Sequence, residues 1–265
     1  MATFAFFSGL FGLAPLDPRA APARTLRVTG THEVCIHAPE DDAVMEAFMA
    51  QAQAAALAAG DDKYDDVMEE FCTAQPQQYW AQLWPSAYAM SQWVCDEPSL
   101  VAGKTVLELG CGLGLSSVCA ALAGAEHVHA TDREEPALRF VEHNAAANGV
   151  RDRVTAGHLD WEDAADAATT PYDVVIAADV VYDESAGPLL ARLLPRLVKP
   201  AGGLLLLADN ADRPYKAERR TALLDELGRG EGAFAPASAP RTVPVALETR
   251  QGDQFEVVLA ALVRE

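Results

Sequence analysis

Positive charge is scarce in this chain of 265 residues. Lys and Arg number 20 against 39 Asp and Glu, which gives a formal net charge of −19 at pH 7. A surface with this balance repels phosphate backbones on average, so we expect no nucleic-acid partner. Half of the residues are hydrophobic and 22% are charged. This composition is typical of a globular protein that can bury a core of its own.

Paired cysteines are also missing. The five cysteines are scattered, odd in number and without a Cys-x-x-Cys spacing, which argues against a disulfide framework and against a zinc site. The most prominent histidines lack the spacing with carboxylates that metal ligands need, so we expect no metal. A reducing compartment fits this cysteine usage, and we expect a cytoplasmic protein.

Long apolar runs are absent as well. The apolar start of the chain extends over only about a dozen residues, too few to span a bilayer, and it lacks the basic beginning of a signal peptide. We therefore expect no membrane segment and interpret residues 1–29 as a flexible tail. Arg19, Arg24 and Arg27 follow with few acidic neighbours, which leaves import into an organelle open as an alternative.

Residues 30–100 are predicted to cover the site of a larger domain. Alternating apolar and polar positions over 24–39 indicate a short hairpin. Residues 41–59 are strong helix formers that begin with two aspartates and stop at Gly60, which indicates a helix. A second helix is expected over 85–95, because Pro85 suits a first helical turn.

Residues 101–265 are predicted to form one domain in which strands and helices alternate. Strands are expected over 105–110, 127–132, 153–161, 172–182 and 202–210, and helices over 114–125, 135–149, 187–198 and 215–228. This alternation indicates right-handed crossovers and a parallel sheet. Segments 241–250 and 254–263, joined through 251–253, add an antiparallel hairpin. We therefore predict an α/β fold with a doubly wound, Rossmann-like sheet of seven strands, mostly parallel.

The most informative segment is a strand that runs into a glycine-rich turn and then a helix. Gly110, Gly112 and Gly114 allow a sharp turn and the close approach of a ligand. Leu115 stands where a dinucleotide fingerprint places its third glycine, which disfavours a pyrophosphate. Glu108, just before the turn, would repel a pyrophosphate and suits a cationic or amine-bearing ligand.

Asp132 ends the next predicted strand, eighteen residues beyond Gly114. A carboxylate at this position of a doubly wound fold faces the ligand crevice and can accept both hydroxyls of a ribose. An N-cap for the helix that begins near Glu134 is the alternative role. With Glu108 and the glycine turn, Asp132 indicates a nucleoside that carries a positive centre, and S-adenosylmethionine fits that description.

Four segments together resemble a known family. They are residues 82–87, 108–114, 159–161 and 178–182, and the last contains an Asp-x-x-Tyr motif. Over residues 76–265 the chain resembles the seven-β-strand class I methyltransferases, and within them the family-16 type of protein-lysine methyltransferases. The resemblance implies S-adenosylmethionine as cofactor, with contacts from Trp84, Gly110, Cys111, Gly112, Asp132, Trp161 and Ala178. Glu108, Gly114 and Asp160 are further candidates, Asp160 as an acceptor for the exocyclic amine of adenine.

Asp179 and Tyr182 are the catalytic candidates. We expect them to close the strand over 172–182, at the edge where a parallel sheet presents ligands. A lysine attacks a sulfonium methyl only as the neutral amine, and its reference pKa lies near 10.4. Asp179 would attract and orient the amine, and Tyr182 would wall its channel. The alternative is that Asp179 only caps a turn.

The sequence therefore favours a protein-lysine N-methyltransferase that uses S-adenosylmethionine and acts on a protein substrate as a monomer. A small-molecule methyltransferase is the first alternative. In that case residues 30–95 would close the acceptor pocket. A catalytically silent module with the same fold is the second. The presence of Glu108, Asp132 and Asp179 argues against a silent module, because such a protein need not keep them.

Overall fold

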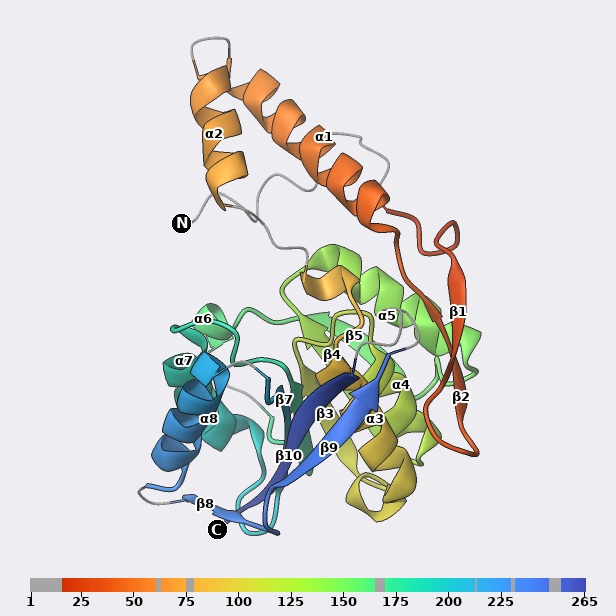
Figure 1. Ribbon diagram of the computed structural model, residues 1–265, viewed down its shortest axis with the longest axis vertical. Helices are drawn as coiled ribbons and strands as arrows, with labels where there is room; N and C mark the ends of the chain where they lie inside the picture. The colour runs from red at the N-terminus through yellow and green to blue at the C-terminus, as the bar shows by residue number, and fades with distance from the viewer. Residues whose placement is uncertain are drawn as a thin grey trace.

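A computed structural model of the chain describes residues 16–60, 63–74, 79–164, 170–212, 214–229, 232–247 and 254–265 (Figure 1). Its centre is a sheet with the strand order β5-β4-β3-β6-β7-β10-β8, in which β9 also pairs with β10. The first five strands in this order are parallel, and β10 is antiparallel to β7, β8 and β9. The strands are β3 (Thr105–Leu109), β4 (His127–Asp132), β5 (Val154–His158), β6 (Val174–Ala178), β7 (Leu204–Asn210), β8 (Phe234–Pro236), β9 (Arg241–Ala246) and β10 (Gln254–Arg264).

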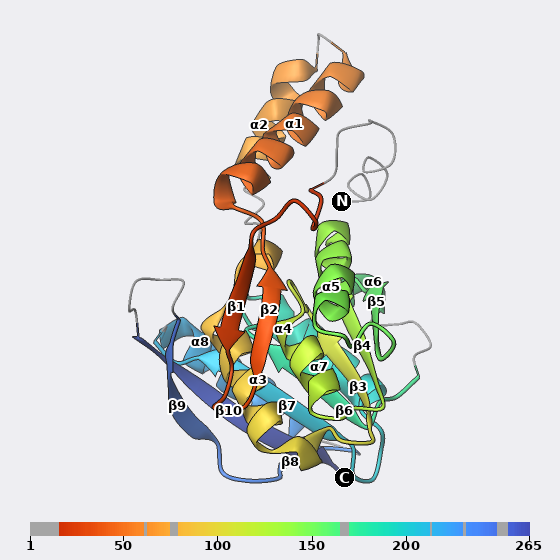
Figure 2. The same cartoon turned by 90° about the vertical axis from the view of Figure 1, so that its right-hand side faces the viewer.

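Helices cover both faces of this sheet (Figure 2). The helices of one face are α3 (Pro85–Asp96), α4 (Leu115–Leu122) and α5 (Glu135–Ala147), and those of the other are α6 (Trp161–Ala164), α7 (Ala186–Leu197) and α8 (Pro214–Leu227). Alternation along the strands makes both faces apolar: Val106 packs with the first layer and Leu107 with the second. The predicted doubly wound α/β class is confirmed.

The N-terminal segment adds a hairpin of strands and a hairpin of helices. Strands β1 (Ala23–Arg27) and β2 (Glu33–His37) are antiparallel, as the alternating pattern predicted. Helices α1 (Asp41–Ala59) and α2 (Tyr64–Ala74) pack against each other and project beyond the sheet (Figure 1). Because β1 begins at Ala23, ordered structure starts before the expected boundary at residue 30. Among the residues that the structure describes, no helix combines the length and apolarity needed to cross a membrane.

Two asparagines fasten the strand hairpin to the main domain. Asn148, the C-cap residue of α5, accepts a hydrogen bond from the amide of Cys35 at 2.8 Å and donates one to the carbonyl of Cys35 at 2.7 Å. Asn144 pairs with His37 in the same way and also donates to the carbonyl of Leu113 at 3.0 Å. Two side chains one helical turn apart thus satisfy alternate backbone groups of β2, as a neighbouring strand would.

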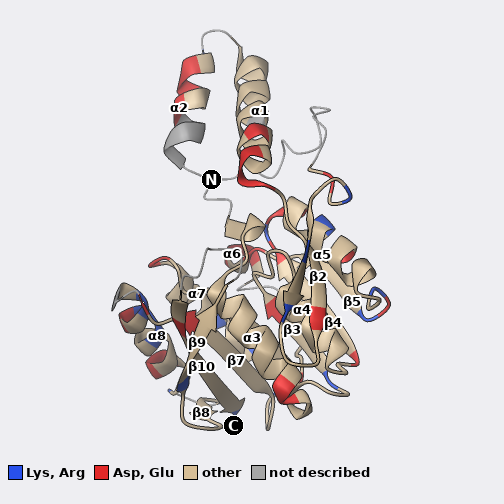
Figure 3. Ribbon diagram, turned by 45° about the vertical axis from the view of Figure 1, so that its right-hand side comes forward, with Lys and Arg blue, Asp and Glu red and all other residues tan. Residues whose placement is uncertain are grey.

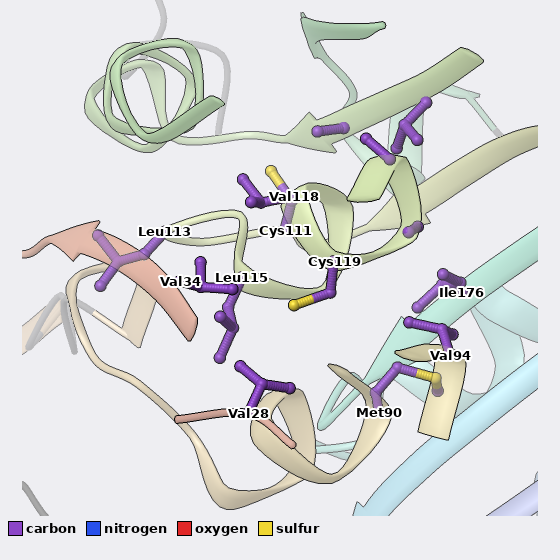
Figure 4. Packing of buried hydrophobic residues seen from close by; sticks show 14 of the residues in the cluster. Val28, Val34, Met90, Val94, Cys111, Leu113, Leu115, Val118, Cys119 and Ile176 are labelled. Atoms are coloured by element: carbon purple, nitrogen blue, oxygen red, sulfur yellow. The ribbon is translucent and has the colours of Figure 1, made fainter. Parts of the chain in front are cut away.

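The packing beneath this hairpin is continuous with the main core. Val28 and Val34 lie with Leu113, Leu115 and Met90 in one buried cluster (Figure 4). This cluster fills the space between the hairpin, the glycine-rich turn and helix α3. The glycine-rich turn is therefore held from the side of the N-terminal segment as well as from the sheet.

Several predicted boundaries were wrong. The strand expected over 172–182 ends at Ala178, because Asp179 has a left-handed backbone with φ of 61° and leaves the strand. The strand expected over 153–161 ends at His158, and Trp161 begins the short helix α6. Strand β8 lies between the helix predicted over 215–228 and the hairpin predicted from residue 241, where no strand was expected, so the described sheet has eight strands where seven were predicted. The predicted connection 251–253 lies outside the described residues.

Candidate active site at the carboxyl edge of the sheet

The predicted site residues gather where the strand order reverses. From β3 the chain continues outward through β4 and β5, and it then returns to place β6 on the other side of β3. In open α/β sheets the connections on the two sides of such a switch point leave in opposite directions, and ligands bind between them. The glycine-rich turn follows β3, and Asp179 follows β6 directly. Ala178, also a predicted site residue, is half-buried in the last position of β6.

All three glycines of the turn have left-handed backbones, and a Cβ added at each would meet a different neighbouring residue. Gly110 has φ of 63°, and a Cβ there would lie 3.5 Å from the ring of Trp161. Gly112 faces the backbone of Trp80, whose carbonyl oxygen would lie 3.0 Å from such a Cβ. Gly114 caps α4 and would place a Cβ 2.8 Å from Val141 of α5. Gly114 is thus required by helix packing, whereas Gly110 borders the ring of a predicted ligand contact.

Asp132 closes the glycine turn from the neighbouring strand. Its Oδ2 accepts a hydrogen bond from the amide of Gly112 at 2.9 Å, and its Oδ1 accepts one from the amide of Glu134 at 3.0 Å. Helix α5 begins one residue later, with Glu134 itself as N-cap, so Asp132 is not the cap residue. Burial raises the pKa of Asp132. A carboxylate has about four acceptor positions, so two backbone donors leave room for ligand hydroxyls.

Glu108 lies deeper than the sequence suggested. Its side chain is buried at the end of β3 and accepts a hydrogen bond from the hydroxyl of Ser117 in α4. Burial raises the pKa of Glu108 to about 7. Cys111, in the turn itself, is also buried, and burial together with the nearby carboxylates Asp132 and Glu108 raises the pKa of its thiol well above the usual value. Glu108 thus supports the turn through helix α4.

Asp160 and Trp161 lie beside Asp132 after strand β5. The amide of Leu159 donates to the carbonyl of Asp132 at 3.1 Å, which brings this segment to the glycine turn. Asp160 Oδ1 accepts a hydrogen bond from the amide of Glu162 at 2.9 Å and so helps to start α6. The ring of Trp161 is half-buried and borders Gly110. The two residues therefore lie next to the glycine turn, with Oδ1 of Asp160 engaged in a turn.

Four aromatic rings continue the site toward the N-terminal segment. The ring centroids of Trp161 and Tyr182 lie 6.5 Å apart, and those of Tyr182 and Tyr79 lie 5.5 Å apart. Tyr79 in turn contacts Trp84 edge to face at 5.6 Å and accepts a hydrogen bond from its indole nitrogen at 2.9 Å. Tyr79 was missed by the sequence reasoning. The tyrosine five residues before the tryptophan of the motif in 82–87 was the available signal.

The carboxylate of Asp179 is already paired within the chain. It forms a hydrogen-bonded ion pair with Lys216 of α8, and the two side chains are 8% and 3% exposed. Its backbone amide donates to the carbonyl of Ala208 at 2.8 Å, which fixes the left-handed turn next to β7. The sequence reasoning treated Asp179 as available for an incoming amine, but in this structure a lysine of the same chain fills that role.

Helix α8 contacts the loop after β6 and the end of β7 through three basic residues that the sequence reasoning missed. Arg219 donates to the carbonyl of Tyr182 at 2.7 Å, and Arg220 donates to Asp209 of β7 at 2.9 Å. Lys216 lies 3.5 Å from the other oxygen of Asp209. Their spacing of three and four residues places all three on one face of the helix. That spacing, in a chain with few basic residues, was the available signal.

Comparisons with known proteins agree with this geometry. A family model described as lysine methyltransferase matches residues 66–220, which is more than half of the chain. The electron transfer flavoprotein beta subunit lysine methyltransferase of Xenopus laevis is 32% identical over 49% of this chain and 52% of the relative. The protein-lysine N-methyltransferase EFM3 of Chaetomium thermophilum is 31% identical over 59% and 49% of the two chains. The chain spans about half the length of these relatives.

Solved structures show the same fold at lower identity. A provisionally assigned SAM-dependent methyltransferase from Streptococcus mutans is 17% identical, with a TM-score of 0.52 over 68% of this chain and 49% of that chain. At this identity the likeness concerns the fold alone. The match to the family model covers β3 to β7, the glycine turn, Asp132 and the loop that contains Asp179. The chain belongs to the lysine methyltransferase family.

Proposed function

We propose that this protein transfers a methyl group from S-adenosylmethionine to a lysine side chain of a protein substrate. The observation that carries the proposal is the meeting of two predicted half-sites at one switch point. The glycine turn with Asp132 lies on one side, and the loop of Asp179 and Tyr182 lies on the other. Membership of the lysine methyltransferase family and relatives named as protein-lysine methyltransferases support the choice of acceptor.

The residues around the glycine turn fit the cofactor. Asp132 has acceptor positions left over for the ribose hydroxyls, in addition to its bonds to Gly112 and Glu134. The missing side chain of Gly110 leaves backbone exposed next to the ring of Trp161, on which an adenine can stack. Asp160 lies one residue away and retains an oxygen for the exocyclic amine. When bound, S-adenosylmethionine supplies a methyl group on a positively charged sulfur.

Four other predicted contacts support this half-site from around it. Cys111 and Gly112 contribute backbone of the turn, Ala178 ends the neighbouring strand β6, and Trp84 joins through Tyr79 to the aromatic rings. We assign Glu108 and Gly114 supporting roles. Glu108 holds α4 through Ser117, and Gly114 lets α4 start against α5. Both act on the position of the turn without needing to contact the ligand.

Asp179 and Tyr182 receive the acceptor amine. The lysine must lose a proton before its nitrogen can attack, and a buried site favours the neutral form over the ammonium. Asp179 orients the amine through a hydrogen bond, while Tyr182 and Tyr79 wall the path that leads to it. Burial raises the pKa of the Tyr182 phenol, so this hydroxyl stays protonated at neutral pH and acts as a hydrogen-bond donor or wall.

We infer a monomeric enzyme whose partner presents a basic face around the target lysine. The chain carries a net charge of −19, and acidic residues mark the start of α1 and much of α2, which project from the end of the molecule that carries α6 (Figure 3). Exposed carboxylates attract a basic partner over roughly a Debye length. The same charge disfavours nucleic acid as a substrate. The cytoplasm is the proposed compartment.

Methyl transfer from labelled cofactor to a cell lysate tests the function. We expect label on a protein band, and mass spectrometry of the labelled peptide should place the methyl group on a lysine. Calorimetry supplies the second measurement, with S-adenosylmethionine binding more tightly than NADH. Label that appears only in small molecules would mean that the acceptor is a metabolite and not a protein. Tighter binding of NADH than of S-adenosylmethionine would overturn the assignment of the glycine turn.

A further inference from the structure

Lys216 lies between two carboxylates at the acceptor half of the site. Its Nζ is bonded to Asp179 and lies 3.5 Å from Oδ1 of Asp209. All three side chains are buried, at 3%, 8% and 5% exposure. An ammonium in such surroundings is stable only while it is paired, because its desolvation is otherwise uncompensated. Lys216 therefore forms ion pairs with both carboxylates, but its hydrogen bond goes to Asp179 and not to Asp209.

Asp209 is positioned to accept a hydrogen bond from the ammonium of Lys216. Arg220 donates to its Oδ2 at 2.9 Å and fixes the carboxylate. Its Oδ1 is buried and, among the residues that the structure describes, has no hydrogen-bond partner. A buried acceptor left without a donor is unfavourable, because it has lost its water and gained no hydrogen bond in exchange. A shift of Lys216 from Asp179 to Asp209 would satisfy this oxygen and keep the ammonium paired.

We propose that Lys216 is an internal counterpart of the substrate lysine, holding the ammonium position at Asp179 and passing to Asp209 when the acceptor amine enters. This proposal rests on the proposed function, because it assumes that Asp179 receives the acceptor. The exchange explains how a carboxylate with 8% exposure becomes available to a ligand. No bond forms or breaks in the exchange, and only the hydrogen-bond partners of Asp179 and Asp209 change.

The charges of the group also favour the reactive form of the acceptor. Asp179 and Asp209 are balanced by Lys216 and Arg220, so the four side chains carry no net charge. An entering lysine that stayed protonated would add an uncompensated positive charge beside two cations. Nearby like charges lower the pKa of an amine. The group therefore receives the neutral amine more readily than the ammonium, as methyl transfer requires.

A direct test fills the space of the Lys216 side chain with a small amine. Lys216→Ala removes three methylene groups and the ammonium, and n-propylammonium chloride supplies the same atoms. We expect this salt to raise the melting temperature of Lys216→Ala in a saturable way and to leave the wild type unchanged. Tetramethylammonium chloride at equal concentration controls for ionic strength, because it cannot donate to Asp179. The measurement requires no enzymatic activity, so its result stands even if the proposed function fails.

Lys199→Ala is the matched control for amine binding. Lys199 pairs with Asp173 at 2.7 Å, but these side chains are 46% and 34% exposed, so n-propylammonium should not stabilise that variant. Failure of the amine to stabilise Lys216→Ala, or equal stabilisation of Lys199→Ala, would overturn the proposed ammonium position. If Lys216→Ala does not fold, Lys216→Met keeps the length of the side chain, and the kinetic test then decides.

Kinetics separates an internal competitor from a residue that only positions Asp179. Lys216→Met should lower the KM for the protein substrate roughly tenfold, because Asp179 is then free in every molecule. Lys216→Arg keeps the competing cation and should leave KM near the wild-type value. Asp209→Asn weakens the second position and should raise KM. A lower kcat with unchanged KM in Lys216→Met would overturn the exchange and leave Lys216 a fixed support of Asp179.

Discussion

The two halves of the site treat their carboxylates differently. On the proposed cofactor half, Glu108 and Asp132 accept hydrogen bonds from a serine hydroxyl and from backbone amides. On the proposed acceptor half, Asp179 and Asp209 are paired with the cations of Lys216 and Arg220. All four carboxylates are buried or nearly so. The difference therefore lies in the charge of the donors and not in the distance from solvent.

This difference indicates how each half meets its ligand. Neutral donors do not cancel the charge of a carboxylate, and burial raises the pKa of both Glu108 and Asp132. Burial also raises the pKa of Asp209, to about 6, but there the cations of Lys216 and Arg220 act against it. A ligand that brings hydroxyls or positive charge improves the surroundings of Glu108 and Asp132, so the cofactor half is ready to bind. The acceptor half is already balanced by its own cations and must exchange partners before an amine can enter. Substitutions on one half should therefore change mainly the affinity for the cofactor, and substitutions on the other half mainly the turnover.

The largest effect is expected from Asp179→Asn on the acceptor half. The asparagine keeps the shape and removes the charge that orients the amine. We expect kcat/KM to fall at least about a hundredfold, which corresponds to roughly 2.7 kcal/mol of transition-state stabilisation. Calorimetry should show a much smaller change in the affinity for S-adenosylmethionine. Equal losses in turnover and in cofactor binding would mean that the two halves are not separate.

Asp132→Ala makes the reciprocal change on the cofactor half. Loss of a charged acceptor should lower the affinity for S-adenosylmethionine by roughly ten- to a hundredfold, or about 1.5 to 3 kcal/mol. The amides of Gly112 and Glu134 also lose their partner, so the melting temperature of the free protein must be measured beside the affinity. Normal cofactor affinity in a folded Asp132→Ala variant would contradict the assignment of the ribose contact.

Much of the fold follows from local patterns in the sequence. The apolar segments with intervening helices predicted β3 to β7 in the right order, although the ends of β5 and β6 were wrong, because alternation and glycine stops depend on neighbours in the chain. The wrong boundary after β6 has a local physical reason. Asp179 has a left-handed backbone, which its valine-rich segment does not predict. Its amide donates a hydrogen bond to the carbonyl of Ala208, 29 residues further along the chain. Such a turn is fixed by tertiary contacts.

For the candidate site, the sequence indicated residues that the fold brings together, but not the hydrogen bonds and ion pairs that connect them. Motifs identified Asp132, Trp161 and Asp179, and the sheet brings the three to one edge. The pairing of Asp179 with Lys216 joins residues 37 positions apart, and no local pattern specifies such a partner. The bonds from Asn144 and Asn148 to β2 span more than 100 positions. The four-residue spacing of the two asparagines is visible in the sequence, but hydrogen bonds at the end of their own helix would explain that spacing equally well.

The pH dependence of stability in Glu108→Gln tests whether the buried Glu108, which has only neutral hydrogen-bond donors, holds a proton in the folded protein. The pKa of Glu108 is raised from 4.5 to about 7 in the folded protein, so the folded state holds a proton that the unfolded state has lost between these values. The stabilisation from the protonated form is complete below about pH 4.5 and is lost as the pH rises through 7. Urea unfolding should therefore show Glu108→Gln gaining on the wild type from pH 5 to pH 8, by on the order of 2 kcal/mol. An equal stability difference at both pH values would place Glu108 in a more polar environment than the structure does.

The smallest expected effect separates two glycines of the same turn. Gly110 and Gly114 both have left-handed backbones, with φ of 63° and 77°, so replacement by alanine strains each of them similarly. Only Gly114→Ala also presses a Cβ against Val141, at 2.8 Å. We expect Gly114→Ala to be less stable than Gly110→Ala by about 1 kcal/mol or more in urea unfolding, as overpacking predicts. Val141→Ala should remove most of this difference when it is combined with each variant.

Gly110→Ala should in turn lose more cofactor affinity, because its Cβ points at Trp161 on the ligand side. Two variants with equal stability, or a greater loss of cofactor affinity in Gly114→Ala, would assign both glycines to the ligand and none to the packing of α4 on α5.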